Sequence, residues 1–272
     1  MAVGAGGASM YNIDNNGWTP GNDYNSNSLA NPSNQDLNAI IEVGGTFFAV
    51  GNACVGSSCA SNAGVILSST DGATWTSHTP ATTVTTNNLR GIAHGANYVA
   101  VGDNGTILTS GDGNTWASHA VTIPLPTIPA TTAPLTANLK QVASIGNLIV
   151  AVGDAGIIVM SKDAGATWVV QTLPNTPNLV GVTAESLIMG NDVIANIVDG
   201  WLGIIPNVQF VAVDSSGNAY ATQRSPTNTA NTTGLTWSQT IINTGASSLN
   251  AIVSSGFGYV AVGNAGTTTS AF

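Results

Sequence analysis

Charged side chains are scarce in this chain. The 272 residues include four Lys and Arg against thirteen Asp and Glu, a net charge of −9, and charged residues make up only 6% of the composition. An average soluble protein has about 25% charged residues. With so few cations the chain can neither track nucleic-acid phosphates nor hold a polybasic patch against a membrane, so both kinds of partner are excluded. Because 43% of the residues are hydrophobic, a packed core is expected rather than disorder.

Long apolar runs are also missing. The longest apolar stretches are interrupted by Asn, Asp or Gly well short of the about 18 residues of a membrane-spanning helix, so no membrane insertion is expected. Residues 1–10 contain no basic residue and no apolar segment of the kind found in signal peptides. We therefore expect a mature or excised segment, or one that reaches its site without such a signal.

Cysteine is nearly absent as well, since the chain has only two. Cys54 and Cys59 lie in one loop rich in Gly, Ser and Ala, where a disulfide would close a small ring and restrict the unfolded chain. Two free thiols in a reducing compartment are the alternative. No His stands beside them, which excludes a structural zinc site. The low charge and the abundance of Thr, Asn, Ser and Gly favour an oxidising, extracellular setting or a cell or virion surface.

What the sequence does contain is an internal repeat built on the string Val-Ala-Val-Gly. Copies, some with one substitution, occupy residues 48–51, 99–102, 150–153, 211–214 and 260–263, and a truncated copy occupies residues 2–4. A Leu-x-x-Ile/Val pattern precedes the complete copies and starts at Leu37, Leu89, Leu139, Leu179 and Leu249. A Trp follows every copy except the last, at Trp18, Trp75, Trp116, Trp168 and Trp237. Short β-branched segments between Gly, Asn and Asp turns, repeated every about 40 to 50 residues, are typical of propeller blades.

The sequence therefore predicts an all-β fold, a single five-bladed β-propeller domain over residues 1–272 with four antiparallel strands in each blade. We expect the blades at residues 37–80, 89–120, 139–172, 179–242, and 249–272 plus 1–20. In this last blade, strands from the N- and C-termini pair and close the ring, which removes open sheet edges. The alternative is a strand exchanged between identical chains, since residues 2–11 and 265–272 both resemble a third strand where one blade needs only one.

The turn before three of the tryptophans has a common form. Residues 161–168 read Ser-Lys-Asp-Ala-Gly-Ala-Thr-Trp, and residues 69–75 and 110–116 are one residue shorter. This turn resembles the Asp-box, or BNR, repeat of sialidase-like β-propellers. The resemblance implies a structural role, in which Asp accepts backbone N–H groups, Gly takes a positive φ and Trp packs between blades. The residues in these roles are Asp71, Trp75, Asp112, Trp116, Asp163 and Trp168.

The same resemblance prompts a test for enzyme activity. Sialidase-like active sites hold the substrate carboxylate with three arginines, whereas this chain has only Arg90 and Arg224. No other catalytic pattern is recognisable, and no Gly-rich phosphate loop follows a strand and opens a helix. We therefore expect a protein that is not an enzyme, with no catalytic residues, no metal site and no cofactor.

Equivalent positions of the repeat point to a ligand site. The residue after the first-strand Leu is Arg90 in one blade and Lys140 in the next, and it is Asn38 and Asn250 in two others. First strands line the central channel of a propeller, so Arg90 and Lys140 would form a small positive spot at its mouth, flanked by the two Asn. A carboxylate or an acidic glycan would suit this spot. The alternative interpretation is that both cations neutralise nearby Asp or Glu.

The fourth repeat carries an apolar insertion at residues 186–208. A short helix there would place Ile194, Ile197 and Trp201 on one face, which predicts either a self-association surface or packing against the propeller itself. A second unusual segment, residues 118–138, contains four prolines and is expected to be extended and polyproline-like.

Two functions are compatible with these features. The first is a non-catalytic recognition or adhesion module, extracellular or on a surface, that binds a glycan or a protein ligand. The second is a structural subunit of an extracellular filament, which joins copies of itself by strand exchange at the termini or through the apolar insertion.

Overall fold

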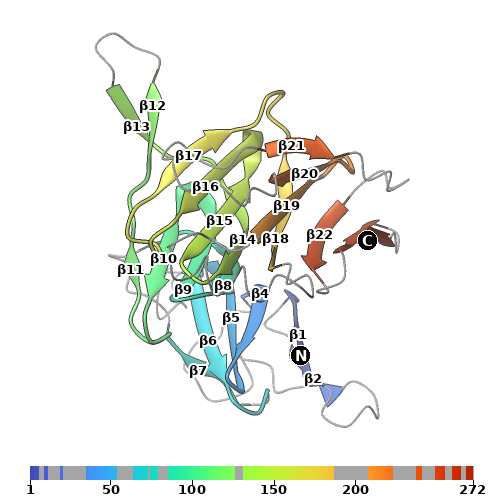
Figure 1. The fold of residues 1–272 in the computed structure, drawn as a ribbon. Coiled ribbons are helices and arrows are strands. Elements are labelled where there is room, and N and C mark those ends of the chain that lie inside the picture. Colours follow the sequence, from blue (N-terminus) through green and yellow to red (C-terminus); the bar gives the residue numbers. More distant parts are fainter. Residues whose placement is uncertain are drawn as a thin grey trace, which may run out of the picture. The chain divides into compact units, whose positions relative to one another are not determined.

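The computed structural model is built almost entirely of β-strands (Figure 1). It describes residues 1–5, 9–11, 19–20, 35–53, 64–72, 74–78, 85–125, 131–186, 208–222, 237–240, 249–254, 259–264 and 268–271. The chain divides into two compact units, residues 1–139 and 140–272, which we describe one at a time. Among the described residues, no helix is both long enough and apolar enough to cross a membrane.

The first unit contains two four-stranded antiparallel sheets in which each strand pairs with the next along the chain. One consists of β4 (Leu37–Val43), β5 (Thr46–Ala53), β6 (Gly64–Ser69) and β7 (Thr76–Ser77). The other consists of β8 (Leu89–His94), β9 (Tyr98–Gly102), β10 (Ile107–Ser110) and β11 (Ala117–Ser118). A three-stranded sheet of β1 (Ala2–Val3), β2 (Ser9–Tyr11) and β3 (Thr19–Pro20) precedes them, and a hairpin of β12 (Thr122–Leu125) and β13 (Thr131–Pro134) follows.

The second unit repeats the same arrangement, and its first strand begins at the last residue of the first unit. One sheet consists of β14 (Leu139–Ile145), β15 (Leu148–Gly153), β16 (Ile157–Ser161) and β17 (Val169–Thr172). The next consists of β18 (Leu179–Ser186), β19 (Val208–Asp214), β20 (Ala219–Thr222) and β21 (Trp237–Thr240). A three-stranded sheet of β22 (Leu249–Ser254), β23 (Tyr259–Gly263) and β24 (Thr268–Ala271) follows.

The core lies between neighbouring sheets, which explains why the second strands are apolar on both faces. In the first unit, Phe48 and Val50 of β5 pack against Leu89 and Ile92 of β8, so the second strand of one sheet contacts the first strand of the next. In the second unit, β19 packs against β22 in the same way. A continuous apolar run such as Val-Ala-Val is what a strand covered on both sides requires. Full burial of each Val, Leu or Phe contributes about 1.5–3 kcal/mol to folding.

The terminal strands differ from the predicted arrangement. The N-terminal strands pair with one another, β1 with β2 and β2 with β3, while β22, β23 and β24 form a separate sheet. No described pairing joins the two ends of the chain, so the five-blade count and the closure of the last blade stay predictions. The prediction gave the N-terminus one or two strands of a shared blade, whereas the structure forms three strands there.

The proline-rich segment is extended as predicted, but it pairs with itself. Strands β12 and β13 pair as a hairpin, which projects from the first unit (Figure 1). The register places Pro134 opposite Thr122 and Pro124 opposite Thr132. Both residue pairs are of the same kind in the antiparallel ladder, the kind in which the backbone nitrogen points away from the partner strand. This position suits proline. Proline therefore does not prevent the pairing.

Candidate functional site

Each of four repeats places a polar pair where its first strand approaches the end of its second strand. Arg90 in β8 forms a two-point ion pair with Asp103, in which Nε donates to Oδ1 and Nη2 donates to Oδ2 over 2.9 Å. Asn88 Nδ2 also donates to Oδ2 of Asp103 over 2.9 Å. The side chains of Arg90 and Asp103 are 38% and 21% exposed, so solvent screens their attraction and the pair contributes little to stability.

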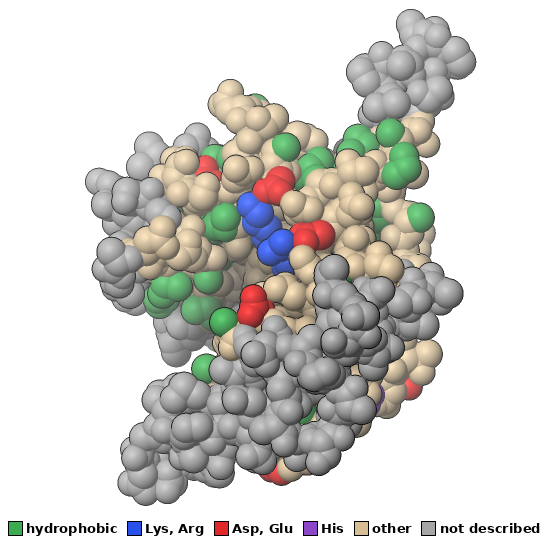
Figure 2. All heavy atoms as spheres, turned by 180° about the vertical axis from the view of Figure 1, so that it is seen from behind, with side chains coloured by type: hydrophobic (Ala, Val, Ile, Leu, Met, Phe, Trp, Pro, Cys, Tyr) green, Lys and Arg blue, Asp and Glu red, His purple; other side chains and the backbone are tan. Residues whose placement is uncertain are grey.

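Lys140 has the same kind of partner in the second unit. Its Nζ atom lies 2.5 Å from Oδ1 of Asp154, the residue that follows β15. On the face shown in Figure 2, basic side chains accordingly lie against acidic ones. Each cation is neutralised within its own unit, which agrees with the alternative interpretation of the sequence. A neutralised cation attracts an anionic ligand only weakly.

Asn38 and Asn250 occupy the equivalent positions and bind uncharged groups. Asn38 Nδ2 donates to Oδ1 of Asn52 over 2.8 Å and to the backbone oxygen of Leu89 over 2.7 Å, so it also ties β4 to β8. Asn250 Nδ2 donates to Oδ1 of Asn264 over 2.8 Å. These hydrogen bonds occupy polar groups that the sequence assigned to a ligand, so the pairs serve first to join strands.

The Asp-containing turns hold their carboxylates with backbone N–H groups. In the turn before Trp116, Asp112 Oδ1 accepts the N–H groups of Thr115 and Asn114 over 2.9 Å each and the Ser110 hydroxyl over 3.0 Å. These hydrogen bonds stabilise the ionised form and lower the pKa of Asp112 to about 2. The Asp112 carboxylate is therefore held within its own turn.

The other two turns are built alike. Asp71 Oδ1 accepts the Thr74 N–H over 2.7 Å, and Asp163 Oδ1 accepts the Thr167 N–H over 2.8 Å. The hydrogen bond from the Thr167 hydroxyl is the main reason that the pKa of Asp163 is lowered.

The tryptophans that follow these turns differ in burial. Trp75 and Trp116 are buried, whereas Trp168 is half-buried. Trp116 lies in the cluster that contains Phe48 of the preceding sheet. Its Nε1 donates to the backbone oxygen of Gly113 over 3.1 Å. The indole thus fixes the turn and packs across two sheets of the first unit.

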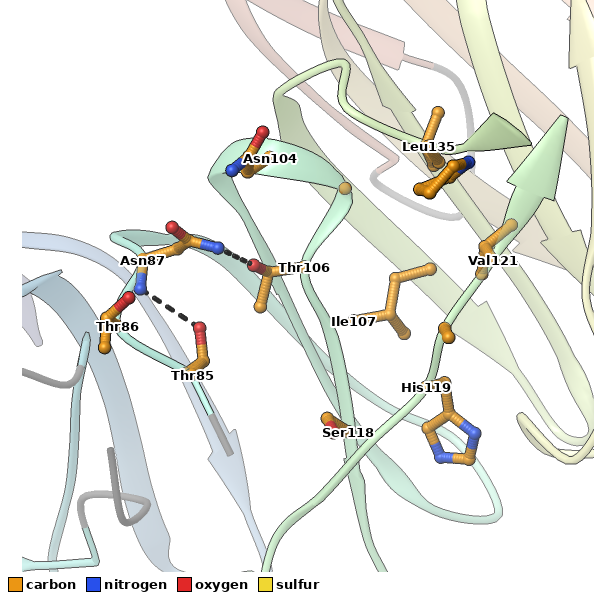
Figure 3. A pocket seen from close by; sticks show the side chains of 13 residues that line it. Thr85, Thr86, Asn87, Asn104, Thr106, Ile107, Ser118, His119, Val121 and Leu135 are labelled. Atoms are coloured by element: carbon orange, nitrogen blue, oxygen red, sulfur yellow. Dashed lines mark hydrogen bonds between the residues drawn. The ribbon is translucent and has the colours of Figure 1, made fainter. Parts of the chain in front are cut away.

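A pocket in the first unit is a better candidate for a binding site. It has a volume of about 390 Å³, and Val121 and Leu135, which flank the β12–β13 hairpin, contribute to its wall. Figure 3 shows Thr85, Thr86 and Asn87 on one side, Val121, Leu135 and His119 on the other, and Thr106 and Ile107 between them. Ligand pockets usually enclose about 300–1,000 Å³, so this one suits a short segment of a ligand. The sequence did not reveal it, because four separate segments form its wall.

The polar groups of the pocket are hydroxyls and amides. Asn87 Nδ2 donates to Thr106 Oγ1 over 2.8 Å, and Thr106 Oγ1 donates to the backbone oxygen of Asp103 over 2.7 Å. His119 is the one titratable side chain among the described residues that line the pocket. Its Nε2 lies 2.6 Å from Thr109 Oγ1, and burial lowers its pKa, so the imidazole is neutral at pH 7. The pocket therefore offers hydrogen bonds and apolar contacts but no charge.

Asp214 is a buried residue that the sequence analysis did not single out. It stands where the other repeats have the Gly of Val-Ala-Val-Gly, and only 3% of it is exposed. Its Oδ1 accepts the N–H groups of Ser216 and Asn218, and its Oδ2 accepts the Asn218 amide, each over 2.9 Å, and the Tyr220 hydroxyl over 3.0 Å. Burial first, and then Asp214, raise the pKa of Tyr220 to about 12. The replacement of the repeat's Gly by Asp214 was the signal in the sequence that could have pointed to this residue.

The structure does not describe two sets of the predicted residues. Cys54 and Cys59 lie outside the described residues, and so do Ile194, Ile197 and Trp201. The disulfide and the self-association helix therefore stay predictions. Within the part of the chain that the structure describes, no group of three His, Cys, Asp or Glu side chains is arranged to hold a metal ion.

Comparison with known proteins identifies the fold. No family model and no curated protein matches the chain. The structure of YCF48 bound to D1 peptide is 15% identical, with 97% of this chain and 69% of that chain covered and a TM-score of 0.54. YCF48 from Cyanidioschyzon merolae is 15% identical over 96% and 66% of the two chains with a TM-score of 0.46, and the WD40 β-propeller domain of Doa1 is 10% identical over 85% and 62% with a TM-score of 0.48. Likeness at this level of identity informs on fold alone, and it agrees with the four-stranded antiparallel sheets: the chain has a β-propeller fold.

Proposed function

We propose that the protein is a non-catalytic recognition module, extracellular or on a cell or virion surface, whose ligand is a protein segment. The pocket beside the β12–β13 hairpin carries this proposal, because it is the concave site in which hydroxyl, amide and apolar groups converge. The ion-paired cations are a less suitable site, since their charges are already neutralised.

The chemistry of the pocket favours a peptide over a glycan. Its hydroxyls and amides match the donors and acceptors of a peptide backbone, and its Ile107, Val121 and Leu135 side chains suit small apolar groups. Among the described residues that line it, there is no Trp, Tyr or Phe ring on which a sugar could stack. YCF48, which has a similar fold, has been solved with a peptide bound, and this supports a peptide ligand by analogy of fold.

The finer points of the architecture belong to the same proposal. We take the three Asp turns to be Asp-box elements with a structural role, and the complete molecule to have five blades closed by strands from its two ends. The hydrogen bonds of Asp71, Asp112 and Asp163 support the first point. The repeat spacing supports the second.

A pocket-filling substitution tests the ligand site. Ala120 is exposed and lines the pocket, so Ala120→Trp fills it without altering the core. Ala117 is exposed on β11 and does not line the pocket, which makes Ala117→Trp a matched control. We expect peptides selected from a displayed random library against the wild-type chain to bind A120W about tenfold more weakly and A117W equally well. Peptides that bind A120W unchanged, or ligands found only on a glycan array, would contradict the proposal.

A second candidate function is that of a structural subunit that associates with copies of itself. The specific observation in its favour is the exposure of three valines on β22 and β23. Soluble proteins rarely expose a contiguous apolar patch without a partner for it.

A further inference from the structure

The chain that leads from β11 into the hairpin pairs on one side only. β11 stands at the end of its sheet, beside β10. Just after it, the His119 N–H donates to the backbone oxygen of Ile107 over 2.9 Å, and the backbone oxygen of Val121 accepts the Leu135 N–H over 2.9 Å. In an extended chain, the backbone groups of successive residues point to opposite sides. The odd-numbered residues of this stretch therefore turn their backbone groups towards β10 and then towards β13.

The even-numbered residues turn their backbone groups the other way. Ser118, Ala120 and Thr122 are exposed, and within the described part of the chain no hydrogen bond reaches their backbone N–H or C=O groups. We call these three residues the open edge. Each of them offers one donor and one acceptor, in the alternating order that an added β-strand requires. The next residue on the same side, Pro124, has no N–H, so the row of donors ends there.

The hairpin that lengthens this edge is an insertion into the repeat. In the sheet β14–β17, a tight turn follows the last strand, and in it the Thr176 N–H donates to the backbone oxygen of Leu173 over 3.3 Å. In the sheet β8–β11, the corresponding hydrogen bond, from Leu135 to Val121, encloses the whole of β12 and β13. The insertion therefore carries the open edge past the point at which the other repeat ends its last strand.

The open edge is continuous with the pocket. Ser118, His119 and Ala120 line the pocket and belong to this same stretch of chain (Figure 3). A strand bound on the open edge would therefore lie beside the pocket. Edge strands are commonly protected from added strands by charged side chains, but residues 117–125 contain no Asp, Glu, Lys or Arg.

We propose that the peptide ligand binds as an added β-strand on the open edge. Main-chain hydrogen bonds to Ser118, Ala120 and Thr122 supply affinity, and the pocket beside them selects among peptide side chains. The occupant is a short, extended and uncharged segment of a partner protein: short because the row of donors ends at Pro124, and uncharged because neither the edge nor the pocket offers a charge at pH 7. This inference deepens the proposed function and rests on it.

A proline at residue 122 tests the open edge without altering the pocket. Thr122 lies opposite Pro134, does not line the pocket, and directs its N–H away from β13. Thr122→Pro removes this donor and obstructs an incoming strand, so we expect library-selected peptides to bind about tenfold more weakly. Thr172→Pro is the matched control, since Thr172 is exposed at the end of β17 and its N–H also points away from the neighbouring strand. We expect T172P to bind the peptides as the wild-type chain does, with circular dichroism to confirm that both variants fold.

N-methylation of the peptide gives a readout that depends on strand pairing. In an added strand, alternate residues donate to the open edge and the residues between them point away from it. We expect methylation at every second backbone nitrogen to weaken binding about tenfold, and methylation at the others to change it by less than about twofold, in isothermal titration calorimetry. This series uses the wild-type chain, so it remains decisive if T122P does not fold.

The outcomes separate this inference from the proposed function. Binding that A120W weakens, but that T122P and every N-methylated peptide leave unchanged, overturns the open edge and keeps the pocket. Binding that neither A120W nor T122P weakens overturns both. A wild-type chain that dimerises in sedimentation velocity, together with a T122P chain that stays monomeric, would assign the open edge to a second copy and overturn the peptide as its occupant.

Discussion

Replacement of Asp214 by Ala should destabilise the second unit more than any exposed substitution. The Asp214 carboxylate accepts four hydrogen bonds, from the Ser216 and Asn218 N–H groups, the Asn218 amide and the Tyr220 hydroxyl. A buried donor left without an acceptor costs about 1–3 kcal/mol. These hydrogen bonds are only partly buried, so water can satisfy part of what the donors lose, and we expect a loss of about 3 kcal/mol for Asp214→Ala.

The conservative variants divide this loss. Asp214→Asn keeps one good acceptor oxygen, so about 1.5 kcal/mol should be lost, and Tyr220→Phe should cost about 1 kcal/mol. Asp214 and Tyr220 are joined by one hydrogen bond, which either substitution removes. The loss in the double variant should therefore be about 1 kcal/mol smaller than the sum of the losses in D214A and Y220F. Glu42→Ala, at an exposed position of β4, is the control and should change the free energy of unfolding by less than about 0.5 kcal/mol.

Urea unfolding with linear extrapolation measures these differences. A loss below about 1 kcal/mol for D214A, or full additivity with Y220F, would refute the network argument.

The pH dependence gives a second readout, because the pKa of Tyr220 is raised to about 12. The stability that comes from a neutral Tyr220 is present below about pH 10 and is lost as the pH rises through about 12. Removing Asp214 should lower this pKa, as followed by tyrosinate absorbance.

Two further predictions concern the first unit. A Cβ on Gly113 would lie 2.7 Å from Cε1 of the buried Phe48 at a φ of +75°, whereas Gly45 has a φ of +83° and nothing within 4 Å. Gly45→Ala should therefore lower the free energy of unfolding by about 1 kcal/mol, from the backbone conformation alone. Gly113→Ala should lower it by about 1–2 kcal/mol more, as measured by urea unfolding. Equal losses in the two variants would contradict the close packing of Gly113 against Phe48. Burial lowers the pKa of His78 and His119, so the unfolded chain takes up protons first and stability should fall as the pH drops below about 6.5. His78→Gln and His119→Gln should each flatten that decline in thermal unfolding followed against pH, and an unchanged profile would disprove their part in it.

The repeat made the strands predictable. Strand β8 begins at Leu89 and β18 begins at Leu179, where the Leu-x-x-Ile/Val pattern starts. Period and turn residues act locally, so the sequence alone reveals them. The ends of the chain were harder, because several of its segments can act as a second or third strand and only pairing energies choose among them.

The candidate site was less predictable because it depends on contacts between segments. The repeat revealed the equivalence of Arg90 and Lys140, but not that Asp103 and Asp154 stand opposite them. Those acidic residues follow the Gly of their own repeats, so an alignment of both positions would have exposed the pairs. The pocket lies between residue 87, residue 106 and residue 135, and no local pattern links these three.

The projecting β12–β13 hairpin carries one proline on each strand, Pro124 and Pro134. A proline nitrogen has no hydrogen to give, so each outer edge of this ribbon has a gap in its row of donors. A strand from another molecule that tried to extend the ribbon would lose a hydrogen bond at that gap on either side. Both edges of the ribbon are therefore poor templates for a further strand, and we expect the hairpin to resist edge-to-edge aggregation.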